Sequence, residues 1–150
     1  MIRPQADVVG LTIRPVEDGD IGSLIALWGV CELTRPWNDP LSDIAHARAT
    51  EHASILLGFS GYALVASVMV GYDGHRGWVY YLAVDPVAQN RGHGRAMMAA
   101  AEAWLSERGA PALRLMVRDA NSDALRFYKA LGFERQDVVV LGKRLGASPA

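Results

Sequence analysis

The segment Gln89–Ala96 (Gln-Asn-Arg-Gly-His-Gly-Arg-Ala) combines glycine with basic side chains, as anion-binding loops do. It follows an apolar run and opens a long expected helix, whose first backbone N–H groups are unpaired and carry partial positive charge. Gly92 and Gly94 lack a Cβ, so a phosphate can approach the backbone closely. Three side chains add positive charge with no acid among them: Arg91, His93 and Arg95. These residue types suit a pyrophosphate.

Two common nucleotide motifs do not fit the same segment. A dinucleotide fingerprint needs a third glycine where Met97 stands, and the early strand that this fingerprint requires is missing. The sequence also lacks the Gly-x-x-x-x-Gly-Lys-Ser/Thr pattern of a P-loop. An ordinary loop-to-helix turn that uses glycine for its geometry is the remaining alternative, and two glycines alone do not decide between it and a pyrophosphate site.

Apolar and β-branched runs around this segment predict alternating strands and helices. The expected strands are Val8–Arg14, Ile55–Phe59, Tyr62–Tyr72, Trp78–Val84, Leu113–Val117 and Val138–Leu145. The expected helices begin near Asp20, Ser42, Gly92 and Asn121, and the last two end before Gly109 and Gly132. The pattern predicts an α/β or α+β fold, a mixed sheet with helices on its faces.

The run Trp78–Val84 shows no alternation of apolar and polar residues, so we expect both its faces to be buried at the centre of the sheet. Ser67 interrupts the densest apolar stretch, Tyr62–Val70. That stretch is too short to span a bilayer. No linker divides the chain, and we expect one domain over residues 1–150, with residues 1–8 as a loose N-terminal extension.

Charge and cysteine content exclude several classes of protein. The chain has 150 residues, with 15 Lys and Arg against 16 Asp and Glu, which gives a formal net charge of −1. Such a balance argues against a partner that is nucleic acid or a membrane surface. A single cysteine, Cys31, cannot form an internal disulfide, which favours the cytoplasm. His46 and His52 lack neighbouring ligands, so we expect no metal site.

Two motifs together resemble a known family. Gln89-x-x-Gly92-x-Gly94 resembles the acetyl-CoA pyrophosphate motif of the GNAT superfamily of N-acetyltransferases. The segment 121–133 (Asn-x-x-Ala-x-x-Phe-Tyr-x-x-Leu-Gly-Phe) is similar to the second signature of that family. Segments 33–40, 71–77 and 141–145 resemble the bacterial YpeA-like branch in particular. The resemblance extends from about Val8 to Leu145 and implies a mostly antiparallel sheet of about six or seven strands with one splayed parallel pair.

The resemblance implies a place for acetyl-CoA. The splayed pair would be Trp78–Val84 and Leu113–Val117, and the exposed main chain of the first strand would pair with the pantetheine amides. The implied cofactor-binding residues are Leu82, Ala83, Val84, Gln89, Asn90, Arg91, Gly92, His93, Gly94, Arg95, Ala96, Asn121 and Tyr128. Asn121 matches the position that hydrogen-bonds the pantetheine arm.

Tyr128 matches the usual general acid of this family. A phenol with an ordinary pKa near 10 is protonated at neutral pH, so it can protonate the thiolate of the leaving coenzyme A. A main-chain N–H near Leu82 or Ala83 would stabilise the oxyanion. The alternative is that Tyr128 is a core aromatic residue on one helix stripe with Leu125 and Leu131.

Neither the general base nor the acceptor site is fixed by the sequence. Family members often carry a Glu on the central strand, and Trp78–Val84 has none. Candidates for the base are Glu32, Asp39, Asp73, His75 or a chain of waters. The acceptor site would include Arg35, Trp37, Asn38 and Asp39, although these residues could equally form a structural connection between two helices.

The sequence therefore predicts acetyl transfer from acetyl-CoA to a primary amine by direct attack in a ternary complex. The acceptor could be a small amine, an amino acid or a peptide N-terminus. Cys31 falls on the apolar side of the first helix, so we expect a buried thiol rather than a nucleophile. The alternatives are a non-catalytic module that binds acetyl-CoA and a nucleotide-binding domain, and the resemblance is compatible with a homodimer.

Overall fold

The computed structural model describes residues 10–146. The expected N-terminal extension, residues 1–8, lies outside them. The chain divides into two compact units, Met1–Leu115 and Met116–Ala150, and each is described by itself. The first unit contains, in order, β1 (Thr12–Pro15), η1 (Asp18–Asp20), α1 (Ile21–Val30), α2 (Pro40–Arg48), β2 (Ala53–Ser60), β3 (Ala63–Tyr72), β4 (Gly77–Val84), η2 (Pro86–Ala88), α3 (His93–Glu107) and β5 (Leu113–Leu115). The second contains α4 (Ser122–Ala130).

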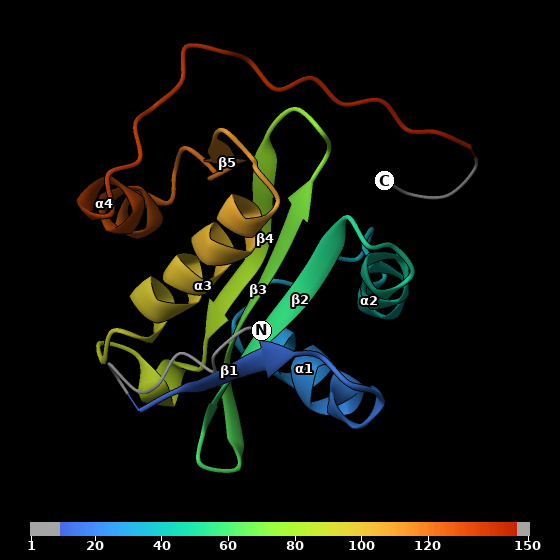
Figure 1. The fold of residues 1–150 in the computed structure, drawn as a ribbon, viewed down its shortest axis with the longest axis vertical. Helices are drawn as coiled ribbons and strands as arrows, with labels where there is room; N and C mark the ends of the chain where they lie inside the picture. Colours follow the sequence, from blue (N-terminus) through green and yellow to red (C-terminus); the bar gives the residue numbers. More distant parts are fainter. Residues whose placement is uncertain (1–9, 147–150) are drawn as a thin grey trace. The chain divides into compact units, whose positions relative to one another are not determined.

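The first unit is built on one mixed sheet of five strands in the order β1-β2-β3-β4-β5 (Figure 1). Neighbouring strands are antiparallel except β4 and β5, which are parallel. The mixed α/β class is confirmed, but the expectation of six or seven strands is wrong for the described residues.

The missing strand is the one expected at 138–145. These residues form no regular secondary structure, and their apolar side chains are exposed, as Val139 and Leu141 show. A β-branched run becomes a strand only where a neighbouring strand accepts its backbone hydrogen bonds. The strand expected at 113–117 also ends early, at Leu115.

Helices cover both faces of the sheet. Successive β2 residues point to opposite faces, so Ile55 and Leu57 pack with Leu24 and Trp28 of α1, while Gly58 faces Met97 of α3. The methionines Met97 and Met98 are fully buried between α3 and the sheet, as expected. Helices α1 and α2 therefore share one face, and α3 covers the other (Figure 1).

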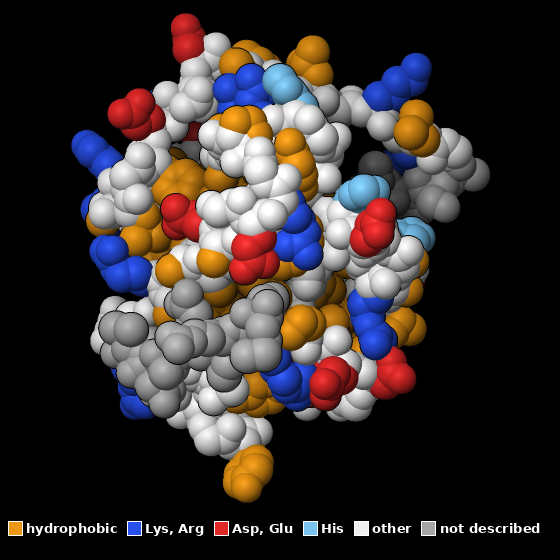
Figure 2. Space-filling model, viewed as in Figure 1, with side chains coloured by type: hydrophobic (Ala, Val, Ile, Leu, Met, Phe, Trp, Pro, Cys, Tyr) orange, Lys and Arg blue, Asp and Glu red, His pale blue; other side chains and the backbone are white. Residues whose placement is uncertain are grey.

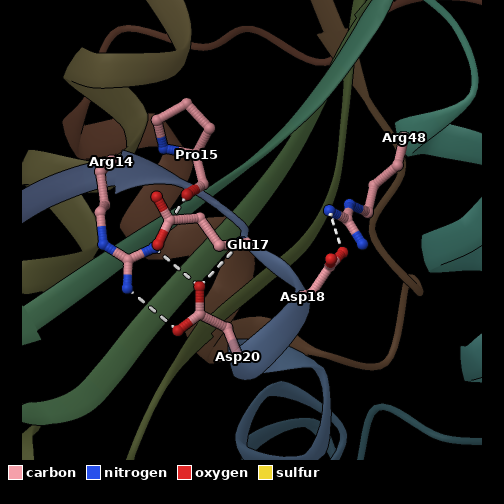
Figure 3. A network of polar contacts seen from close by, with 6 residues as sticks. All are labelled: Arg14, Pro15, Glu17, Asp18, Asp20 and Arg48. Carbon is pink, nitrogen blue, oxygen red and sulfur yellow. Dashed lines mark hydrogen bonds and ion pairs between the residues drawn. The ribbon is translucent and has the colours of Figure 1, made fainter.

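A polar network joins β1 to the start of α1 (Figure 3). The Arg14 guanidinium donates two hydrogen bonds to the Asp20 carboxylate, at 2.7 and 3.0 Å. Arg48 of α2 forms an ion pair with Asp18 at 2.7 Å. The Arg14 interaction lowers the pKa of Asp20 and raises that of Arg14. The Arg14–Asp20 contact thus holds β1 against the start of α1, and the Arg48–Asp18 contact links the end of α2 to the turn before α1.

The strand β4 lies fourth in the sheet, between β3 and β5, rather than at its centre, and it is less uniformly buried than its sequence predicts. Gly77, Val79 and Ala83 are buried, but Tyr80 is 44% exposed. The absence of polar residues therefore did not mark burial of both faces along the whole strand.

The second unit contains α4, which is capped as the sequence predicts. The Asn121 side chain accepts a hydrogen bond from the backbone N–H of Ala124 at 3.1 Å. Gly132 follows the helix with φ +94°, a left-handed conformation that glycine adopts without strain. The Tyr128 ring contacts Phe127 and Phe133 edge to face, with centroids 5.0 and 5.5 Å away.

Acidic and basic side chains are interspersed on the face shown in Figure 2. This agrees with the nearly balanced charge of the chain. Within residues 10–146, no helix has the length and apolar character needed to cross a bilayer.

Gly77→Ala should destabilise the fold by about 1–3 kcal/mol, because the core at this position has no room for a methyl group. An added Cβ would lie 2.5 Å from Leu105 Cδ1 and 3.1 Å from its Cγ, and Leu105 is buried. Gly29→Ala is the control, since Gly29 lies on the exposed side of α1 with nothing within 4 Å. Urea unfolding measures the stability of both variants and of the unchanged protein. A Gly77→Ala variant as stable as the unchanged protein would contradict the close packing of α3 on β4.

Candidate active site

The parallel pairing of β4 with β5 ends after three residue pairs, Gly77–Leu113 to Val79–Leu115. The strand β4 continues to Val84, still paired with β3 on its other side. Within residues 10–115, no strand pairs with this second half of β4 along the edge that faced β5. The first unit thus offers a length of strand edge to which an amide-bearing ligand could add.

Only alternate peptide groups face this edge. The Asp85 N–H donates to Val65 O of the β3 side at 2.8 Å, so Ala83, two residues earlier, also faces β3. Leu82 and Val84 face the open edge. The Val84 carbonyl already accepts hydrogen bonds from Gln89 Nε2 at 3.1 Å and from the Cys31 thiol at 3.3 Å. The main chain of Leu82 and the N–H of Val84 are therefore the groups that this edge offers to a ligand.

An irregularity in β4 lies directly before Leu82. The register with β3 shifts between Ser67 and Met69, and Tyr81 adopts φ +52°, which is left-handed. The Ser67 hydroxyl donates to the Tyr81 carbonyl at 2.9 Å and accepts from Trp28 Nε1 at 2.9 Å. The Trp28 and Tyr81 rings stack with centroids 3.8 Å apart. The polar residue that interrupts the apolar run of β3 therefore holds the bulge of β4.

Tyr81 also reaches the neighbouring helix α2. Its hydroxyl donates to Asp43 Oδ2 at 2.6 Å. Burial and this hydrogen bond to a carboxylate both raise the pKa of the Tyr81 phenol. The sequence did not single out Tyr81 or Asp43, which are 38 positions apart. In the sequence, the only feature that could have indicated this contact was the presence of Tyr81 inside an apolar strand.

The glycine loop leads from β4 into α3 as the sequence predicts. The Gln89 side chain donates a hydrogen bond to the Val84 carbonyl, which links the loop to the end of β4. Asn90 and Gly92 have φ +63° and +81°, and α3 begins directly after Gly92. Gly94, Arg95 and Ala96 lie in its first turn, whose early backbone N–H groups lack partners within the helix. Arg91 and Arg95 are exposed beside these groups.

The expectation that His93 adds positive charge is wrong. Its side chain is only 4% exposed, and within the described residues its Nδ1 has no hydrogen-bond partner. Burial, with a smaller effect of Arg91, lowers the pKa of the imidazole. His93 is therefore neutral near pH 7, and the positive charge at this loop comes from the two arginines and the helix start.

The second signature lies in the second unit. Asn121 uses its side-chain oxygen to cap α4, and its amide group can still donate a hydrogen bond. Burial raises the pKa of Tyr128 to about 12. The phenol is therefore protonated at neutral pH, as a general acid must be, whereas the aromatic contacts of its ring match the structural alternative.

The four acceptor candidates lie between α1 and α2. Arg35 donates to the Glu32 carbonyl at 2.8 Å, and Trp37 is 47% exposed. Asn38 precedes Asp39, whose carboxylate accepts from the backbone N–H of Leu41 and from the Ser42 hydroxyl. These bonds lower the pKa of Asp39. Asp39 is thus the N-cap of α2, and an acceptor role for the four residues stays a prediction.

Other candidates for the chemistry have structural roles. Asp73 accepts backbone hydrogen bonds from His75 and Arg76, as a turn residue does. Burial raises the pKa of the Cys31 thiol, which disfavours the reactive thiolate. Among the residues that the structure describes, no group of three or more His, Cys, Asp or Glu side chains could hold a metal ion.

Comparison with known proteins decides the family. The sequence profile of the Acetyltransferase (GNAT) family matches residues 23–133. A protein named acetyltransferase from Yersinia enterocolitica is 42% identical over 135 residues, which cover 90% of this chain and 96% of that protein. The chain belongs to the GNAT acetyltransferase family.

Solved structures support the same fold for this GNAT chain. An aminoglycoside 6'-N-acetyltransferase in complex with a bisubstrate analogue of coenzyme A has a TM-score of 0.78 at 16% identity, and the match covers 90% of this chain and 98% of that one. The ribosomal-protein-S18-alanine N-acetyltransferase from Escherichia coli has a TM-score of 0.73 at 24% identity, with 84% and 79% covered. At such identities the likeness shows the fold alone.

The buried His93 should make stability depend on pH. Its pKa is lower in the folded protein than in the unfolded chain, so the unfolded state binds more protons as the pH falls below about 6.5. The contribution of neutral His93 is complete above that pH and is lost toward the lower, folded pKa. One such group changes the free energy of unfolding by at most about 1.4 kcal/mol per pH unit.

His93→Gln should flatten this dependence between pH 7.5 and 5, measured by urea unfolding at each pH. His46→Gln, at an exposed position of α2, is the matched control and should leave the slope unchanged. An unaltered slope in His93→Gln would show that this imidazole titrates equally in both states.

Proposed function

We propose that this GNAT chain is an N-acetyltransferase of the YpeA-like branch that transfers the acetyl group of acetyl-CoA to a primary amine. The observation that carries the proposal is the open edge of β4 at Leu82, directly followed by the glycine loop at the start of α3. A strand edge suits the amides of pantetheine, and a helix start suits the pyrophosphate. One chain segment thus provides for both parts of the cosubstrate.

In this proposal the Leu82 main chain pairs with pantetheine, and the loop residues Gln89–Ala96 bind the pyrophosphate. The backbone N–H groups of the first α3 turn and the exposed Arg91 and Arg95 face the phosphate oxygens. Ala83 shapes the strand end because it pairs with β3, and Val84 offers only its N–H, because its carbonyl accepts from Gln89 and Cys31.

The reaction needs no covalent enzyme intermediate. An acceptor that arrives as an ammonium first loses one proton to solvent or a base. The lone pair of the neutral amine then attacks the thioester carbonyl, and a main-chain N–H at the β4 edge stabilises the oxyanion. As the tetrahedral intermediate collapses, the C–S bond breaks and the amide C–N bond remains. Tyr128 gives its proton to the departing thiolate, and the nitrogen loses a proton to solvent or a base. Asn121 binds the pantetheine arm.

The acceptor carries a primary amine, either on a small molecule or at a peptide N-terminus. Arg35, Trp37, Asn38 and Asp39 form its outer contacts in this proposal. The chain acts as one domain in the cytoplasm, and a homodimer is compatible with every step because each chain contains all of the proposed groups.

Titration calorimetry with acetyl-CoA and with ATP tests the cosubstrate. Acetyl-CoA should bind and ATP should not, since the site requires pantetheine as well as phosphate. Release of coenzyme A thiol is then followed with a panel of small amines, amino acids and N-terminal peptides. Tight binding of ATP alone would overturn the proposal, and acetyl-CoA binding without thiol release for any amine would favour a non-catalytic module.

Tyr128→Phe should lower kcat by about 100-fold or more, a typical loss for a general acid, while the affinity for acetyl-CoA changes little. The variant keeps the ring that contacts Phe127 and Phe133, so the packing is retained. Tyr62→Phe is the matched control, because Tyr62 is fully exposed at the β2–β3 turn. Steady-state kinetics and calorimetry measure the two effects, and an unchanged kcat would assign Tyr128 to the core alone.

A further inference from the structure

Asp43 is a half-buried carboxylate in the first turn of α2. One of its oxygens, Oδ2, accepts the Tyr81 hydroxyl at 2.6 Å. Within residues 10–146 it forms no ion pair with Lys, Arg or His, whereas Asp18 and Asp20 of η1 pair with arginines. Asp43 is thus a fixed negative charge that the described residues do not neutralise.

The position of Asp43 relates it to the reaction. Tyr81 lies in the bulge of β4, directly before Leu82, and its side chain extends from there to α2. The Trp28 ring stacks on Tyr81 and fixes the direction of the phenol. The carboxylate is therefore held one side chain away from the strand edge at which the thioester is proposed to lie, on the face that α1 and α2 cover.

The surroundings of Asp43 provide only part of what a carboxylate requires. The first turn of a helix favours negative charge. The hydrogen bond from the Tyr81 hydroxyl stabilises the carboxylate further. A partly desolvated carboxylate still gains most from a nearby cation, and an acceptor amine in its ammonium form is such a cation.

We propose that Asp43, oriented by Tyr81, binds the positively charged amine group of the acceptor. The inference rests on the proposed function and adds a substrate class, cationic primary amines without a carboxylate next to the amine. Free α-amino acids would place a like charge beside Asp43, so peptide N-termini and alkyl or sugar amines are preferred. Asp43 contacts substrate in this view, and Tyr81 is a positioning residue.

Asp43→Asn and Tyr81→Phe test the proposal with the full-length protein and the best amine of the panel. Asn keeps the shape of Asp43 and removes its charge, so the KM for the amine should rise about tenfold or more while the KM for acetyl-CoA stays within about twofold. Phe keeps the stack on Trp28 and removes only the hydroxyl, so the effect on the amine KM should be smaller and in the same direction. The double variant should be less impaired than the two single effects combined, because both act on one interaction.

Two controls distinguish binding of the acceptor amine from a purely structural contact between α2 and β4. Glu51→Gln removes an exposed carboxylate from the turn after α2 and should leave both KM values unchanged. Thermal unfolding of every variant shows whether the Asp43–Tyr81 contact only joins α2 to β4. An Asp43→Asn variant with reduced stability and an unchanged KM for the amine would show that Asp43 has only a structural role. That result would overturn the inference.

The acceptor panel provides an independent readout. Glycinamide and glycine differ by one carboxylate next to the amine, and the wild-type protein should favour glycinamide more strongly than Asp43→Asn does. Equal preference in both proteins would also overturn the inference. An inactive wild-type protein that binds no acetyl-CoA would instead refute the proposed function, so the two failures are distinguishable.

Discussion

The bulge of β4 at Tyr81 is the constraint on which both sides of the candidate site depend. A left-handed backbone costs a non-glycine residue about 1–2 kcal/mol. The hydroxyl of Ser67 and the stacked ring of Trp28 offset this cost, with about 1 kcal/mol from the hydrogen bond and about 0.5–1.5 kcal/mol from the stack. The free energies of the contacts and of the strain are therefore of similar size. The bulge persists because Ser67 of β3 and Trp28 of α1 both contact Tyr81 of β4.

The bulge has consequences on both sides of the strand. Its main chain leads directly to Leu82, at the edge that β5 leaves open after Leu115. Its side chain turns toward α1 and α2 and meets Asp43. A regular strand would continue the register with β3 without the shift seen here. One local irregularity thus connects the edge proposed for the cosubstrate with the face proposed for the acceptor.

The sequence predicted what depends on local preferences. Capping residues, glycines after helix ends and the spacing of apolar residues predicted α1, α3 and α4. The glycine loop at the start of α3 was also predicted, because its residue types act through the nearby backbone. The burial of His93 was missed, since the same loop composition suits either a solvated or a buried imidazole. Neither the left-handed Tyr81 nor its contact with Asp43 could be predicted, because both arise from packing between distant segments. Ser67 was noticed as an interruption, and only the fold shows what it bonds to.

Under the proposed function, the distribution of charge would let a nearly neutral chain treat its two substrates differently. Arg91, Arg95 and the start of α3 present positive charge, while Asp43 presents negative charge beyond the β4 bulge. A pyrophosphate is attracted to the first region and repelled by the second, and an ammonium group experiences the reverse. In this proposal each ligand is disfavoured at the other's position, which would give selectivity without a large net charge. A neutral His93 in the loop keeps the positive region on exposed arginines, where it can meet an incoming anion.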